Sequence, residues 1–120
     1  MQYSTLGNSG LLTSRLTLGT MIFGEQSGRA TPKNEALKII DHYLGAGGNH
    51  LDTADVYAEG VSEEIVGEAV RNRRHEVLIA TKVRFPTGEG VNEAGLSRGH
   101  IMDGVHASLR QIGRASCRER

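Results

Sequence analysis

Residues 48–67 read GNHLDTADVYAEGVSEEIVG and carry a strand, a polar turn and the start of a helix. Residues 50–52 (HLD) are too few for their periodicity to classify, but their place directly after a helix-ending glycine pair favours a strand. The next helix is expected to begin at Ser62, because Glu63 and Glu64 then lie in its first turn, where the positive end of the helix dipole favours carboxylates. Strand and helix thus alternate within this stretch, as they do in α/β proteins.

The neighbouring segments continue this alternation. Upstream, Thr31 and Pro32 are expected to open a helix with Thr31 as its N-cap, and Gly47 and Gly48 to end it. Four apolar residues recur at helical spacing between them, namely Ala36, Leu37, Ile40 and Leu44. Downstream, residues 76–81 (EVLIAT) form a nearly continuous apolar run, which predicts a parallel strand buried on both faces.

The two ends of the chain add a hairpin and a third helix. Turn residues at 7–10 (GNSG) separate two short extended runs, which predicts a β-hairpin over residues 3–15, followed by a strand at residues 16–18. A loop rich in Gly and Pro at residues 85–95 leads to a helix capped by Ser97. The resulting order of hairpin, strand, helix, strand, helix, strand, helix predicts an α/β fold with a parallel sheet.

Each of the three predicted parallel strands ends in residues that could bind or react. Lys82 follows the third strand, and Asp52 and Tyr57 follow the second. The first strand leads into Gly19, Thr20 and Met21. Functional groups gather at the carboxyl ends of parallel strands, so we expect an acid, a phenol and an ammonium group on one rim of the sheet.

This combination of groups predicts a proton donor. A tyrosine with an ordinary pKa of about 10 donates its proton poorly at neutral pH, but a neighbouring cation stabilises the phenolate. We therefore predict that Tyr57 is a general acid toward a carbonyl oxygen, that Lys82 tunes it and that Asp52 orients Lys82. Taken singly, each residue also has an ordinary structural explanation, as a packing tyrosine, a solvated lysine or a turn-capping aspartate.

Composition excludes several other functions. The 120 residues include 14 Lys and Arg against 14 Asp and Glu, so they lack the basic excess of a nucleic-acid or membrane-surface binder. No apolar run approaches the ~20 residues that span a bilayer, and the first residues do not form a secretory signal. The lack of a targeting signal favours a cytoplasmic protein. The five His and the single Cys show no paired metal-ligand spacing, so we expect no metal site.

Several ordered motifs resemble segments of the aldo-keto reductase family. Residues 48–67 are similar to its signature region, and residues 16–24 (LTLGTMIFG) to its first strand and exit loop. Residues 79–83 (IATKV) resemble its third-strand lysine segment, and residues 106–110 (HASLR) resemble the helix that leads to its fourth strand. The resemblance is specific, because these motifs match in order and at the right separations.

The resemblance implies a fold, a cofactor and a site. Family members are (β/α)8 TIM barrels that use NADPH, less often NADH, to reduce aldehydes and ketones, so the implied fold is the N-terminal portion of such a barrel with an N-terminal β-hairpin. By this resemblance Tyr57 is the proton donor, Lys82 and Asp52 are its supporting pair, and the substrate is a small carbonyl compound. The implied cofactor-binding residues are Gly19, Thr20, Met21 and Asp52.

Part of the family pattern is missing. Its catalytic set includes a His in a segment reading roughly Asp-Leu-Tyr-Gln-x-His at the end of strand four, and this chain has no such segment; Ala58 stands where many members have Gly. A complete barrel has about 250 residues. We therefore expect residues 1–111 to be an aldo-keto reductase domain truncated before strand four and inactive in isolation. Residues 112–120 (IGRASCRER) resemble the translation of a sequencing-library adapter and are expected to be a non-native tail.

Two alternatives stay open at this point. Barrels of the same family also serve as cytoplasmic β-subunits of potassium channels, where regulation matters more than turnover, and one fold hosts many functions. The chain could also be a self-standing α/β module without catalysis, for which cooperative unfolding as a monomer would be the signature.

Overall fold

The computed structural model describes residues 1–24 and 28–113, and in these the predicted order of elements is confirmed. Two short 3-10 helices, η1 and η2, are added to it. The elements are β1 (Tyr3–Thr5), β2 (Leu12–Ser14), β3 (Leu18–Gly19), α1 (Lys33–Gly45), β4 (His50–Asp52), η1 (Tyr57–Gly60), α2 (Val61–Val70), η2 (Arg74–Glu76), β5 (Leu78–Ala80) and α3 (Arg98–Gln111).

The strands form an antiparallel hairpin and a parallel sheet. In the hairpin β1 pairs with β2, and in the sheet β4 lies between β3 and β5. One row of paired residues in the sheet is Leu18, Leu51 and Ile79, and the next row is Gly19, Asp52 and Ala80. Successive side chains of a strand point to opposite faces, so these two rows face opposite sides of the sheet.

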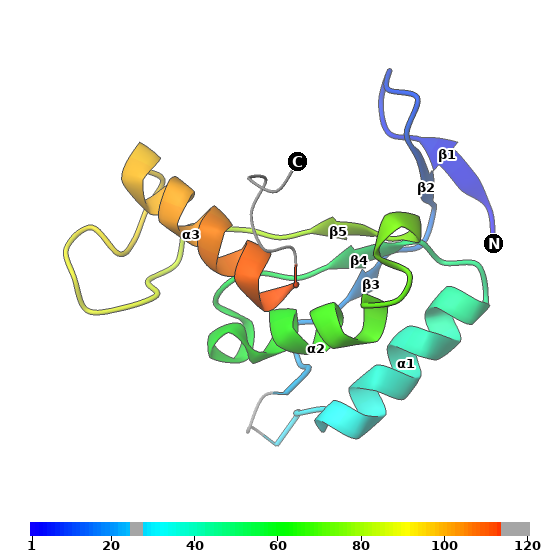
Figure 1. The fold of residues 1–120 in the computed structure, drawn as a ribbon, viewed down its shortest axis with the longest axis horizontal. Coiled ribbons are helices and arrows are strands. Elements are labelled where there is room, and N and C mark those ends of the chain that lie inside the picture. Colours follow the sequence, from blue (N-terminus) through cyan, green and yellow to red (C-terminus); the bar gives the residue numbers. More distant parts are fainter. Residues whose placement is uncertain (25–27, 114–120) are drawn as a thin grey trace.

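The hydrophobic core lies between the sheet and two helices. Figure 1 shows α1 and α2 side by side on one side of the sheet. Leu51 of β4 is fully buried there, together with Ile40 of α1 and Ile65, Val66 and Val70 of α2. Full burial of each such side chain contributes about 1.5–3 kcal/mol. The row that contains Asp52 faces away from this core and remains available for polar chemistry.

The start of α1 differs from the prediction. Pro32 occupies the N-cap position, no side chain caps the helix, and the prediction of Thr31 as its cap was wrong. Thr31 forms an isolated parallel bridge with Phe23, and its N–H donates to the carbonyl of Ile22 at 2.9 Å. The backbone of Thr31 is therefore extended and outside the helix, because it is tied to the segment that leaves β3.

Two strands also differ from the prediction. The strand predicted at residues 16–18 begins at Leu18, because the carbonyl of Leu16 accepts hydrogen bonds from the hydroxyls of Ser14 and Tyr43. The strand predicted to be buried on both faces is only half-buried, since β5 is the edge of the sheet in the described residues. Burial of a strand depends on its neighbours, which its own sequence does not reveal.

The third helix begins as predicted. The hydroxyl of Ser97 accepts a hydrogen bond from the backbone N–H of His100 at 3.1 Å, so Ser97 is its N-cap. The helix packs against α2 and ends at Gln111, and Ile112, the first residue of the predicted tail, is buried. Residues 114–120 of that tail lie outside the described residues. Within the described part of the chain, no helix has the length and apolar character needed to span a membrane.

Candidate active site

The ammonium of Lys82 joins the three residues predicted to act together. It donates to the carboxylate of Asp52 at 2.8 Å, to the carbonyl of Thr53 at 2.8 Å and to the hydroxyl of Tyr57 at 3.3 Å. An ammonium group has three hydrogens, so these contacts use its full donor capacity. The structure therefore brings the acid, the ammonium and the phenol together at the carboxyl end of the sheet.

Adjacent parallel strands produce this proximity. Asp52 is the last residue of β4 and pairs with Ala80 of β5, two residues before Lys82. The ladder continues beyond the strands, because the N–H of Thr53 donates to the carbonyl of Ala80 and that of Asp55 to the carbonyl of Lys82. Asp52 and Lys82 are thus held across one strand spacing by backbone hydrogen bonds.

A tight turn after β4 directs Tyr57 toward Lys82. The backbone N–H of Tyr57 donates to the carbonyl of Ala54, and η1 follows. Ala58 and Glu59 have φ values of 49° and 55°, which are left-handed and unfavourable for residues with a Cβ. Such strain gathers at functional sites. It also gives a physical reason why Gly suits the position of Ala58.

The charge state of Lys82 follows from its partners. Burial would lower the pKa of Lys82, but its hydrogen bonds to Asp52 and Tyr57 and the negative charge of Asp52 outweigh this effect, so its pKa lies above the ordinary 10.5. The ammonium is therefore charged at neutral pH, and its nitrogen also lies 5.0 Å from the ring centroid of Tyr57. Because Lys82 donates to the phenolic oxygen, the hydrogen of that hydroxyl is directed elsewhere and can be given to another acceptor.

The predicted cofactor segment is divided between surface and interior. Gly19 pairs with Asp52, and a Cβ at Gly19 would meet no atom within 4 Å, so the surface beside Asp52 is open. Met21 is 60% exposed. Thr20 is fully buried, and its hydroxyl donates to the carbonyl of Asp52 at 3.1 Å. The acid, the ammonium and the phenol therefore lie beside open surface.

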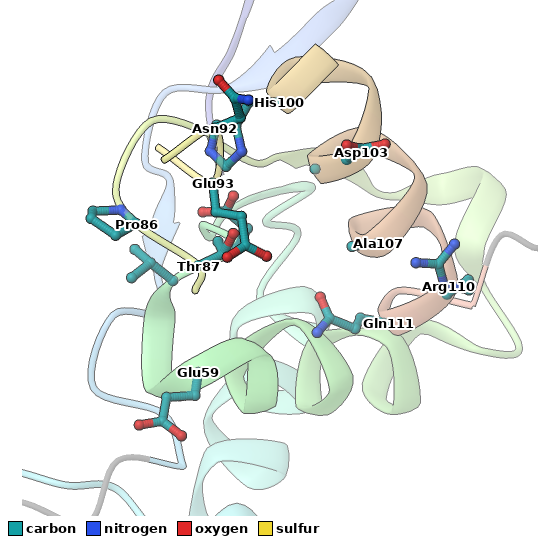
Figure 2. Close-up of a pocket in the computed structure, with 13 residues that line it drawn as sticks. Glu59, Pro86, Thr87, Asn92, Glu93, His100, Asp103, Ala107, Arg110 and Gln111 are labelled. Atoms are coloured by element: carbon teal, nitrogen blue, oxygen red, sulfur yellow. The ribbon is translucent and has the colours of Figure 1, made fainter. Parts of the chain in front are cut away.

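Cavities lie near the site among the described residues. One, of about 270 Å³, is lined by Tyr57 and Lys82 together with the exposed Phe85 and by Leu96. A larger cavity of about 580 Å³ lies between the loop after β5, η1 and α3, as Figure 2 shows, with Asp103, Ala107 and Arg110 along α3 on one side and Pro86 and Thr87 on the other. Of these two cavities, only the smaller is lined by Tyr57 and Lys82.

The sequence did not predict the buried polar residues that lie beneath the site. Thr53 and Ser62 are fully buried beside Thr20, and Glu63 is fully buried beside Thr81. The sequence signal that could have indicated these residues is a threonine directly after each of the three parallel strands. In the described part of the chain, no group of three or more His, Cys, Asp or Glu is arranged to hold a metal ion.

Parallel strand–helix units with polar groups at the carboxyl ends of the strands define an α/β protein. A sequence model of the Aldo/keto reductase family matches residues 15–117. The chain belongs to the aldo/keto reductase family.

Individual proteins with similar sequences support this family membership. A probable voltage-gated potassium channel subunit beta from Oryza sativa subsp. japonica is 42% identical over 116 residues, which cover 93% of this chain and 34% of that protein. Versiconal hemiacetal acetate reductase of Aspergillus parasiticus is 38% identical over 135 residues, covering 94% of this chain and 39% of the relative. The chain therefore spans little more than a third of these curated relatives.

A solved structure agrees as well. The holo form of an aldo-keto reductase from Bacillus halodurans superimposes with a TM-score of 0.76 at 36% identity, over 94% of this chain and 37% of that one. The fold of the described residues is therefore that of part of an aldo-keto reductase barrel.

Proposed function

We propose that this chain is the N-terminal part of an oxidoreductase that uses NADPH, or NADH, to reduce aldehydes or ketones to alcohols in the cytoplasm. The observation that carries the proposal is the contact of the Lys82 ammonium with both Asp52 and Tyr57. Family membership supports the oxidoreductase class, and the names of relatives such as versiconal hemiacetal acetate reductase support a reductase.

In this proposal the chain supplies the proton and holds the groups in place. The nicotinamide, when bound, supplies a hydride to the carbonyl carbon of the substrate. Tyr57 donates its phenolic proton to the carbonyl oxygen, and the Lys82 ammonium stabilises the phenolate that remains. Asp52 keeps Lys82 charged and in position, and Gly19 and Met21 offer the open surface that the nicotinamide ring would face.

The test is an assay of the full-length protein with NADPH or NADH and a panel of small aldehydes and ketones. We expect cofactor oxidation that depends on the carbonyl substrate and that is lost in Tyr57→Phe. Wild-type turnover in Tyr57→Phe would overturn the assignment, and so would the absence of turnover with every carbonyl while NADPH binds. The 120-residue chain alone is expected to be inactive, because it spans about a third of its relatives' length.

A second candidate function is that of a channel subunit. The rice relative, at 42% identity, carries the name of a probable voltage-gated potassium channel subunit beta. Co-purification of the full-length protein with a potassium channel from a membrane fraction would favour this function. Efficient carbonyl turnover without any bound channel would favour the reductase.

We also propose that residues 112–120 are a non-native tail. Sequencing the intact transcript tests this part. A strand-four segment in place of these residues is expected, and the same tail in genomic DNA would overturn it.

A further inference from the structure

Three threonines form a layer beneath the proton-donor residues. Thr20, Thr53 and Thr81 each directly follow the last residue of a parallel strand. Those last residues, Gly19, Asp52 and Ala80, are paired with one another across the sheet, so the threonines lie at one level. Because side chains alternate along a strand, the threonines are placed on the opposite face from Asp52, toward the helices.

Ser62, in the first turn of α2, contacts two of these threonines. The Ser62 hydroxyl donates to the carbonyl of Thr20 at 2.8 Å and to the hydroxyl of Thr20 at 2.9 Å. It also lies 3.3 Å from the hydroxyl of Thr53. The hydroxyl of Thr20 in turn donates to the carbonyl of Asp52. The side chains of Ser62, Thr20 and Thr53 are fully buried, so water does not compete for these hydrogen bonds.

Glu63, the next residue of α2, contacts the third threonine. The hydroxyl of Thr81 donates to the carboxyl of Glu63 at 2.5 Å. The side chain of Glu63 is fully buried and forms no ion pair with the residues that the structure describes. Burial raises the pKa of Glu63, partly offset by the hydroxyls of Thr81 and Ser108. A buried carboxyl without a counter-charge is costly, and its contact with Thr81 offers a reason for its presence.

We propose that Ser62 and Glu63 are positioning residues of the proton-donor site, and this inference rests on the proposed function. Ser62 fixes the ends of β3 and β4, including Asp52 and Thr53, which both accept hydrogen bonds from Lys82. Glu63 fixes Thr81, the residue directly before Lys82. Together they set the distance between the carboxylate of Asp52, at the end of β4, and the ammonium of Lys82, which lies two residues beyond β5.

The cost of losing this support follows from geometry. A misplacement of about 1 Å at a reacting group lowers a rate about a hundredfold. Neither Ser62 nor Glu63 touches the phenol, so their loss is expected to act on kcat through Lys82 while the binding of substrate is retained.

The test compares variants that remove one hydroxyl each in the full-length protein. We expect Ser62→Ala and Thr81→Val to lower kcat by between about tenfold and a hundredfold with little change in KM. Glu63→Gln keeps an oxygen that accepts from Thr81, and Thr81→Ser keeps the hydroxyl, so both are expected to retain wild-type kcat. Equal losses in Thr81→Ser and Thr81→Val would overturn the proposal.

A matched control separates positioning from stability. Ser97→Ala removes a serine hydroxyl from the start of another helix, far along the chain from the rim, and is expected to lower stability by about 1 kcal/mol while kcat is unchanged. If Ser62→Ala and Thr81→Val behave like Ser97→Ala, losing stability but not kcat, their hydroxyls are structural only and the proposal is wrong.

A second measurement does not depend on turnover. The pKa of Lys82, followed by NMR of its side chain in the full-length protein, is expected to fall toward the ordinary 10.5 in Thr81→Val and to stay raised in Thr81→Ser. An unchanged pKa in Thr81→Val would overturn the positioning role. If the wild type reduces no carbonyl, the proposed function fails, whereas this measurement still decides whether the threonine layer holds Lys82.

Discussion

Lys82, just beyond β5, donates a hydrogen bond of 2.8 Å to the carboxylate of Asp52, the last residue of β4. The two side chains are half- and one-third-exposed, so the pair lies at the surface of the rim. An exposed ion pair adds little to stability. Its value lies in fixing the ammonium where it also meets the hydroxyl of Tyr57.

Removing the phenolic hydroxyl of Tyr57 tests its proposed role as proton donor. In the full-length protein, Tyr57→Phe is expected to lower carbonyl turnover by about 10²–10⁴-fold, the usual contribution of general acid catalysis, while cofactor binding is retained. Steady-state kinetics and NADPH fluorescence titration measure the two effects. Tyr3→Phe is the matched control, because its hydroxyl donates to the carbonyl of Gly47, away from the rim, and its turnover is expected to equal that of the wild type.

Replacing Lys82 tests the raised pKa through the pH dependence of stability. A cation whose pKa is higher in the folded than in the unfolded state stabilises the fold fully below the unfolded pKa, here 10.5, and loses this contribution as pH rises through the folded pKa. The difference in unfolding free energy between the wild type and Lys82→Met is therefore expected to shrink above pH 10.5. Denaturant titrations at several alkaline pH values measure it, and a constant difference would contradict the raised pKa.

Replacing Ala58 by glycine tests the backbone strain of the turn that follows β4. Ala58 has a φ of 49°, and a left-handed conformation costs about 1–2 kcal/mol for a residue with a Cβ. Glycine removes this cost but loses more backbone entropy, so Ala58→Gly is expected to raise the unfolding free energy by about 0.5–1 kcal/mol. Ala69→Gly, inside α2, is the control and is expected to lower it. Equal losses in both variants would show that the turn is not strained.

Two glycines of α3 are expected to respond in opposite directions to alanine. A Cβ at Gly104 would lie 2.8 Å from the Cγ2 of Val83, so Gly104→Ala must push α3 away from the loop after β5 and is expected to cost about 1–3 kcal/mol. At Gly99 the nearest atom would be 4.0 Å away, so Gly99→Ala is expected to add about 0.5–1 kcal/mol through helix propensity. Thermal unfolding of both variants measures this, and stabilisation by Gly104→Ala would contradict the close approach.

Local sequence signals predicted where helices, strands and turns lie. They predicted less well which tertiary contacts these elements make and how far they are buried. Turn residues at 7–10 and the cap at Ser97 act on their nearest neighbours, and both the hairpin and the cap are present. Thr31 was predicted as a cap on local preference, but a bridge to Phe23 fixes its backbone instead. Half-burial of β5 likewise depends on the strand beside it.

The candidate site likewise has residues whose proximity could be predicted from the sequence and contacts that could not. Asp52 and Lys82 could be placed on one rim from the sequence, because strand ends in a parallel sheet meet at one edge. Ser62 and Thr20, which are 42 residues apart, could not be paired in this way. The contact between them depends on how α2 folds back over the sheet.

The sequence by itself determined the alternation of strands and helices, the family and the residue types at each strand end, because periodicity, capping and motif spacing are properties of neighbouring residues. Only the tertiary structure decided that the three hydrogens of Lys82 are shared among Asp52, Thr53 and Tyr57. It also buried Glu63, a residue whose first-turn position predicted only a favourable interaction with the helix dipole. Both outcomes depend on strand register and on which helix face meets the sheet, and these are fixed by packing between distant segments.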